Sequence, residues 1–264
     1  MKTAKPLIFL ITFSIFSIAS YAQQEIDLLI LNKNYDEALI QIEKQIVENA
    51  NADLYFKKGL ILTSLQSYQE AVKAYSDALQ LQPENPEIIS EMAENLAVLG
   101  NYQDASPYFQ KSTKLQPENL SLAAKLGRNY ISLKDYKRAY NCFTAIYAKD
   151  STNVYWNKQL AYSAFRIGKK DEAKILYEKV LDQNPRDYSS YFNLIRIYDK
   201  EKESIKIVKL IETGLNNFPG DAEFYGERAK YFFDIKGYVL AKKEYENYFM
   251  AGGDSLYPVL MNYG

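Results

Sequence analysis

Basic and aromatic side chains recur at a constant interval in the later part of this sequence. Arg128, Tyr162, Arg196 and Lys230 are each separated by 34 residues, and further basic or aromatic residues lie one helical turn from them. Arginine and lysine donate charge-assisted hydrogen bonds to carboxylates, and aromatics beside arginine are typical binding anchors. These types and this interval predict a repeating binding surface. Its candidate residues are Arg128, Tyr155, Lys158, Tyr162, Phe165, Phe192, Arg196, Lys230 and Phe233.

Residues suited to catalysis are much harder to find. The chain has no histidine, which removes His-containing hydrolytic triads, His-ligated zinc and haem, and the commonest general base. Neither a phosphate-binding GxxxxGK[ST] loop nor a D-x-D calcium loop occurs. Glu87, Glu91 and Glu94 are spaced like the solvated charges of a helix, so a carbohydrate-processing enzyme with paired carboxylates is a remote alternative. We expect no catalytic residue, cofactor or metal.

A repeat of 34 residues organises the helices that must carry the binding surface. Small or apolar residues mark it, and four residues after each stands a large side chain on the same helix face. Ser67 to Glu70 reads as a Ser-x-x-Glu capping box at the start of a second helix. Pro83 ends that helix, and Asn85 with Pro86 reads as the start of the next one. Each unit is therefore predicted to be a helix, a turn, a helix and a stop. The marker residues are Ala38, Ala71, Ala105, Ala139, Ala173, Ile207 and Ala241.

This pattern resembles the tetratricopeptide repeat family, whose unit is a 34-residue helical hairpin with a small residue in the first helix, an alanine and an aromatic in the second, and a closing proline. The small first-helix site is matched by Gly59, Ala93, Gly127, Ala161 and Ala229, whereas Ile195 departs from it. The resemblance implies an all-α fold, a right-handed α-solenoid superhelix of about seven hairpins. It also implies binding of a protein or peptide.

The resemblance also implies that the candidate residues line a concave groove. In the family's superhelix, this face of each first helix lies on the concave side. The groove is then polarised, with acidic residues such as Glu94 early and the basic and aromatic candidates later. An alternative reading is that the charges are a solvated face and the aromatics pack between repeats. Phe56 and Leu60 stand where relatives with a carboxylate clamp carry lysine and asparagine, so that clamp's specificity is not supported.

The two ends of the chain differ from the repeats. Residues 1–22 combine Lys2 and Lys5 with an apolar run at 7–18 and end in Ser20-Tyr21-Ala22, so they predict a secretory signal cleaved before Gln23. An uncleaved anchor is the alternative, although the run is shorter than the ~20 residues of a spanning helix. Residues 23–51 are predicted to form a degenerate first repeat and 52–254 six hairpins. Residues 255–264 are apolar enough for a cap over the last hairpin or a partner-docking tail.

Charge and cysteine content narrow the expected partners. Without residues 1–22 the chain has 30 basic and 33 acidic side chains, which gives no general attraction to nucleic acid. The single cysteine, Cys142, is expected in the core. We expect an exported, non-catalytic scaffold in the periplasm or envelope of a bacterium that binds a protein, an acidic peptide or helix among the candidates. A permanent subunit of an outer-membrane assembly or secretion complex is the alternative, and the oligomeric state is open.

Overall fold

The computed structural model describes residues 23–254, and all regular secondary structure in that range is helical. The predicted signal, residues 1–22, and the predicted cap or tail, residues 255–264, lie outside the described residues. A helix at 23–31 comes first. The others are α2 (Tyr35–Asn49), α3 (Ala52–Ser64), α4 (Tyr68–Leu81), α5 (Pro86–Val98), α6 (Tyr102–Leu115), α7 (Leu120–Ser132), α8 (Tyr136–Lys149), α9 (Val154–Arg166), α10 (Lys170–Gln183), α11 (Tyr188–Glu201), α12 (Ser204–Asn217), α13 (Ala222–Asp234) and α14 (Tyr238–Met250).

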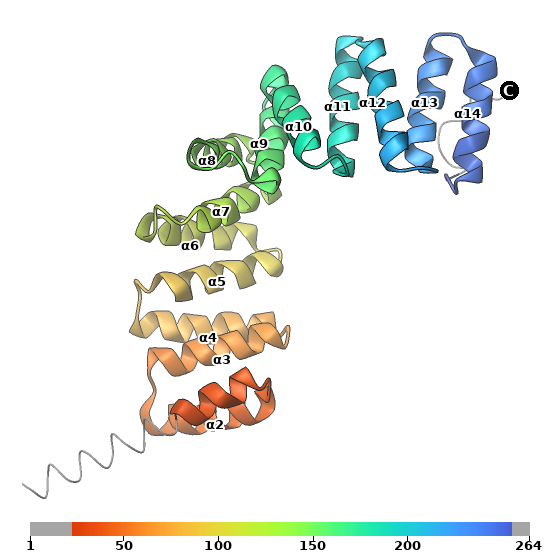
Figure 1. Ribbon diagram of the computed structural model, residues 1–264. Coiled ribbons are helices and arrows are strands. Elements are labelled where there is room, and N and C mark those ends of the chain that lie inside the picture. Colours follow the sequence, from red (N-terminus) through yellow and green to blue (C-terminus); the bar gives the residue numbers. More distant parts are fainter. Residues whose placement is uncertain (1–22, 255–264) are drawn as a thin grey trace, which may run out of the picture. The chain divides into compact units, whose positions relative to one another are not determined.

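The helices form two compact units, which are described separately. Residues up to Leu133 form the first unit, with helices through α7, and residues from Lys134 form the second, with α8 to α14. Within each unit, helices that follow one another in the chain pack side by side (Figure 1). The predicted all-α fold built from about seven helical hairpins is confirmed. The boundary between the units falls in the turn between α7 and α8.

The predicted helix start at Asn85 and Pro86 is confirmed, and four further first helices begin in the same way. The side chains of Asn85, Asn119, Asn153, Asp187 and Asp221 each accept a hydrogen bond from a backbone N–H in the first turn of the helix that follows. Such a cap satisfies one of the N–H groups that a helix start leaves unpaired, and typically contributes about 1 kcal/mol. These five residues fix where the first helices α5, α7, α9, α11 and α13 begin.

The predicted Ser67–Glu70 capping box is wrong. Ser67 precedes α4, but its side chain makes no capping hydrogen bond. The physical reason is the tight turn: the Ser67 backbone N–H, which Glu70 would have to reach, already donates to the Leu62 carbonyl at 2.8 Å. That bond closes the end of α3, where Gln66 adopts a left-handed φ of 60°.

Small residues do lie where two helices approach closely. All seven marker residues of the second helices are buried, and the alanines among them are 0 to 2% exposed. Within the first unit, a Cβ built on Gly59 of α3 would lie 2.4 Å from the Tyr75 ring of α4, so only glycine fits there as the helices stand. The Tyr75 hydroxyl lies 3.0 Å from the Thr63 hydroxyl, which in turn donates to Asn95 at 2.9 Å. The hairpin of α3 and α4 is therefore tied to α5 of the next hairpin by these hydrogen bonds.

Cys142 is only partly in the core. The side chain is a free thiol of intermediate exposure on α8, one residue before the buried Phe143. Burial raises the pKa of its thiol to about 11, so the thiol stays protonated at neutral pH. The prediction of a core cysteine is thus corrected to a half-buried one, because the core position next to it is taken by Phe143.

None of the helices in residues 23–254 is long and apolar enough to cross a membrane.

Candidate functional site

Eight of the nine candidate residues lie on the first helices of the second unit, on what we call the first-helix surface. Helix α9 contributes four of them at intervals of three or four residues, which keeps them on one face. Tyr155, Arg196 and Lys230 are exposed, and the other five are half-buried. The surface consists of Tyr155, Lys158, Tyr162 and Phe165 on α9, Phe192 and Arg196 on α11, and Lys230 and Phe233 on α13.

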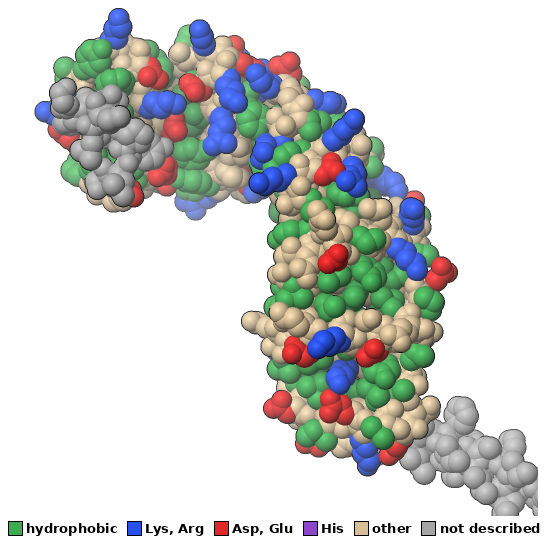
Figure 2. All heavy atoms as spheres, turned by 180° about the vertical axis from the view of Figure 1, so that it is seen from behind, with side chains coloured by type: hydrophobic (Ala, Val, Ile, Leu, Met, Phe, Trp, Pro, Cys, Tyr) green, Lys and Arg blue, Asp and Glu red, His purple; other side chains and the backbone are tan. Residues whose placement is uncertain are grey.

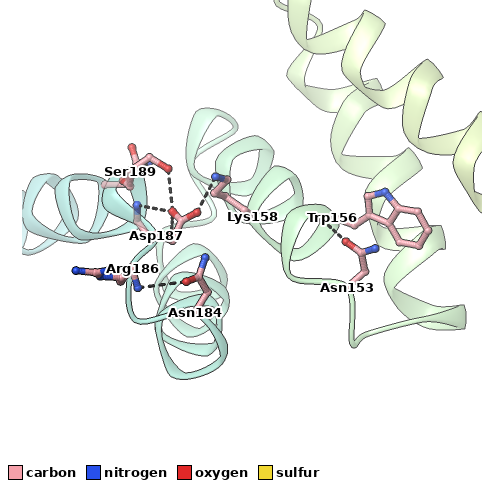
Figure 3. Close-up of polar contacts among 9 residues, drawn as sticks. Asn153, Trp156, Lys158, Asn184, Arg186, Asp187 and Ser189 are labelled. Carbon is pink, nitrogen blue, oxygen red and sulfur yellow. Dashed lines mark hydrogen bonds and ion pairs between the residues drawn. The ribbon is translucent and has the colours of Figure 1, made fainter. Parts of the chain in front are cut away.

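Lys158 is already held by a partner within the unit. Its Nζ donates to Asp187 Oδ2 at 2.7 Å, and Figure 3 shows the two side chains meeting between α9 and the start of α11. The other carboxylate oxygen of Asp187 caps α11 by accepting from the Ser190 N–H at 3.0 Å. Burial raises the pKa of Asp187, but hydrogen bonds from Lys158, Ser190 and Ser189 outweigh it, so the pKa lies below its ordinary value. Lys158 therefore fixes the spacing of two first helices.

Replacing Asp187 with alanine is expected to lower the free energy of unfolding by about 2 kcal/mol at neutral pH, since both the cap and a largely buried charge partner are lost. Asp187→Asn is the matched control, because asparagine caps a helix equally well and only the ion pair with Lys158 is lost. A group with a depressed pKa stabilises the fold above its unfolded pKa and loses this effect as pH falls. The difference between wild type and Asp187→Asn should accordingly shrink at about pH 3 in urea denaturation followed by circular dichroism. An unchanged difference would contradict the assignment.

Arg196 and Lys230 stand one repeat apart, and Lys230 lines a hollow formed by α11, α12 and α13. The hollow has a volume of about 410 Å³, and Asp199, Lys202, Glu227, Lys230 and Asp234 are among its lining residues. Lys230 Nζ lies 3.6 Å from Asp199 Oδ2, with about half of each side chain exposed, so this ion pair contributes little to stability. Burial raises the pKa of Glu227, and the positive charges of Lys230 and Arg196 oppose that shift. The predicted binding residues did not include these acids, of which Asp199 lies one helical turn from Arg196 on the same first helix.

Phe192 and Phe233 pack inside the unit as well as facing outward. The Phe192 ring centroid lies 4.8 Å from those of Tyr188 and Phe224, in a cluster that joins α11 to α13. Phe233 contacts Tyr238, at 5.5 Å between ring centroids, and packs on the core of the last hairpin. Much of the surface of these two rings is therefore in contact with neighbouring helices, as the alternative reading predicts. Their contribution to binding stays a prediction.

Arg166 is a basic residue of this region that the sequence prediction did not include. Its guanidinium carbon lies 3.9 Å from the Tyr136 ring centroid and 5.6 Å from that of Tyr162, and it donates to the Tyr162 hydroxyl at 2.6 Å. The spacing of four residues between Tyr162 and Arg166 on one helix was the signal that could have revealed this contact. Phe165, on the same helix, lies 5.5 Å from Lys200 Nζ. Arginine and lysine thus cover the aromatic faces of α9.

Arg128 belongs to the first unit and has different surroundings. It is exposed on α7 and lines a hollow of about 370 Å³ with Glu94 and Lys125, which form an ion pair. A larger hollow of about 780 Å³ in the same unit is lined by Glu84, Glu87 and Glu91 among others. Residues 23–133 carry 9 basic and 15 acidic side chains, whereas residues 134–254 carry 21 and 18. The first unit is thus net acidic and the second slightly basic, while the predicted polarity of the groove itself stays a prediction.

Comparison with known proteins identifies the repeat. Three family models, each described as a tetratricopeptide repeat, match residues 32–86, 62–129 and 159–187. No curated protein matches the sequence.

Solved structures show the same fold at low sequence identity. The C-terminal part of a TPR repeat-containing protein from Cytophaga hutchinsonii aligns with a TM-score of 0.75 and 16% identity, covering 90% of this chain and 98% of that one. A tetratricopeptide repeat protein from Parabacteroides merdae gives 0.62 and 19%, covering 89% and 94%. YrrB, described as a TPR protein with an unusual peptide-binding site, gives 0.61 and 21%, covering 67% and 92%.

Proposed function

Because this chain belongs to the tetratricopeptide repeat family, we propose that it is an exported, non-catalytic scaffold that binds a peptide or helix of a bacterial envelope protein on its first-helix surface. The observation that carries the proposal is the exposure of Arg196 and Lys230, one repeat apart, on first helices of the unit that also carries the half-buried Tyr162 and Phe192. Aromatic area and cationic hydrogen-bond donors together are what a protein-binding surface requires.

The charges of the site favour a partner segment that carries carboxylates. Lys230 pairs with Asp199 only at 3.6 Å and near solvent, so a partner carboxylate can replace that contact at little cost. Arg196 is exposed and is close enough to Glu227 to oppose the rise in its pKa. YrrB, which shares the fold, is described as having a peptide-binding site, and this supports a peptide as the kind of ligand. Signal cleavage before Gln23 would place the scaffold outside the cytoplasm.

Photo-crosslinking from single positions tests the proposal. A photoreactive phenylalanine analogue at Tyr155, which is 45% exposed on α9, is expected to capture a partner peptide in living cells. The same analogue at Ile175, which is 66% exposed on the second helix α10, is the matched control and should capture less. Intact mass of the recovered protein should show Gln23 as the first residue. Capture from Ile175 but not from Tyr155 would instead favour a permanent subunit that uses its second helices.

A further inference from the structure

The turns that join first and second helices differ in chemistry between the two units. We define this turn edge as the residue with left-handed φ in each turn together with the first three residues of the second helix. In the first unit these positions hold one basic and four acidic residues, and in the second unit seven basic and two acidic ones. The basic ones are Lys134, Lys137, Arg138, Lys170, Lys202, Lys206 and Lys236. Figure 2 shows basic side chains gathered along the second unit on the face that it draws.

Helix physics explains only part of this composition. The first turn of a helix carries a partial positive charge and is stabilised by acidic side chains. The second helices α2, α4 and α6 of the first unit follow that rule, with acidic residues in the first turn. Helices α8, α12 and α14 of the second unit have none there. A basic residue in the first turn works against the helix dipole, so Lys137, Arg138, Lys170 and Lys206 call for another cause. Lys134, Lys202 and Lys236 instead follow the carboxyl ends of first helices, where the dipole favours a cation.

The last two hairpins add exposed apolar side chains to the basic edge. Ile205 and Val239 are 85% and 84% exposed, and Leu240 is 50% exposed. Equivalent positions in the other hairpins are polar or charged, for example Gln69 and Lys137. The nearby hollow is lined by Ile207 and Ile235, not by Ile205 or Val239, whose side chains stand out from the surface. Each protruding residue follows a lysine of the turn by three positions, as Lys202 with Ile205 and Lys236 with Val239.

We propose that the turn edge of α12 and α14 is a docking surface for an anionic lipid membrane. Protruding aliphatic side chains flanked by lysines match the two parts of a lipid interface, since the aliphatic groups enter the acyl boundary while the ammonium groups pair with headgroup phosphates. A protein helix or peptide is bound in a groove, and these side chains protrude. The charge of the edge is complementary to anionic headgroups. Its aliphatic side chains belong to the second helices α12 and α14, whereas Arg196 and Lys230 lie on first helices. Lys202 of the turn lines the same hollow as Lys230.

Vesicle co-sedimentation tests the proposal with a matched pair of variants. Lys236→Gln with Val239→Ser removes one lysine and one exposed valine three residues apart. Lys44→Gln with Val47→Ser removes the same two groups at the same spacing from exposed positions of α2, where Val47 is 87% exposed. Glutamine is compatible with the backbone at 236, because Gln66 adopts the same left-handed φ. A third variant, Lys202→Gln with Ile205→Ser, tests the second pair in the same way.

Wild type is expected to partition onto mixed phosphatidylcholine–phosphatidylglycerol vesicles and much less onto phosphatidylcholine alone, with binding that falls as salt rises. Losing one lysine costs about fivefold and losing the aliphatic group adds to this, so each edge variant should bind at least about tenfold more weakly. The α2 control should bind like wild type. All proteins are compared with the same amino terminus, established by intact mass, because an uncleaved apolar run at 7–18 binds vesicles by itself.

Three results would overturn the lipid assignment. Equal binding to both kinds of vesicle would remove the role of the lysines, and equal losses in the edge variants and the α2 control would show that the edge is not special. The third is an edge variant, folded by circular dichroism, that keeps wild-type vesicle binding but loses crosslinks to an acidic protein, which would assign the edge to a protein partner. None of these results depends on Arg196 or Lys230, so the peptide-binding proposal is judged separately.

Discussion

Replacing Gly59 with isoleucine is expected to lower the free energy of unfolding by about 3 kcal/mol or more. Even a single Cβ at this position would lie 2.4 to 2.7 Å from three atoms of the Tyr75 ring. That ring is fully buried and its hydroxyl is tied to Thr63, so it cannot move aside without breaking contacts in two hairpins. The helices α3 and α4 must separate instead, which exposes core surface. Urea denaturation followed by circular dichroism measures the loss.

A second substitution is expected to recover part of that loss, because the fold itself contains the compensated pair. In the hairpin of α11 and α12, the places of Gly59 and Tyr75 are taken by Ile195 and Ile211, which are 4% and 0% exposed. A larger residue on the first helix is thus matched by a smaller one on the second. Gly59→Ile combined with Tyr75→Ile should therefore be more stable than Gly59→Ile alone, although the hydrogen bond to Thr63 is not restored.

Gly226→Ala serves as the control for changing a glycine inside a first helix. Its new Cβ would meet the Tyr248 ring at 3.2 Å, a contact that small shifts relieve, and alanine favours the helix by about 1 kcal/mol. The net change should stay within about 1 kcal/mol of zero. If Gly59→Ile were as mild as this control, the close approach of α3 and α4 would be misassigned.

The sequence predicts the helices well because one short repeated pattern determines where they begin and how neighbouring helices pack. The repeated small residue, the aromatic four residues later and the Asn or Asp before each first helix all act locally or between neighbouring helices. Ile195 departs from that pattern, yet α11 and α12 still form a hairpin, because the partner position changes from an aromatic to Ile211. A larger residue on the first helix is accompanied there by a smaller one on the second.

The partners of individual polar side chains are much less predictable. Lys158 and Asp187 are 29 residues apart, so their ion pair follows neither from the repeat nor from helical spacing, and depends on how two neighbouring first helices are offset. The Ser67–Glu70 box fails for a related reason, because the left-handed Gln66 directs the Ser67 N–H back to Leu62. The geometry of the turn therefore decides which hydrogen bonds form, and a four-residue motif alone does not predict them.

Replacing both Arg196 and Lys230 with alanine is expected to weaken binding of the partner peptide by about a hundredfold, with little change in stability. Each lost charge-assisted hydrogen bond to a partner carboxylate costs about 1.5 kcal/mol or more, which is roughly tenfold in affinity. The fold should tolerate the change, because Arg196 is exposed and the Lys230–Asp199 pair is half exposed. Fluorescence anisotropy with a labelled peptide identified by crosslinking gives the dissociation constants.

The chain offers a matched control for that experiment. Lys209 and Lys243 are also 34 residues apart and exposed, but they lie on the second helices α12 and α14. If the effect were only a loss of positive charge from the unit, Lys209→Ala with Lys243→Ala would weaken binding equally, and the loss would vanish at high salt. Direct contacts predict instead that only the Arg196 and Lys230 pair matters and that part of the loss persists in salt, since a desolvated hydrogen bond is screened less than a distant charge. Equal weakening by the two double variants would remove the first-helix surface as the binding site.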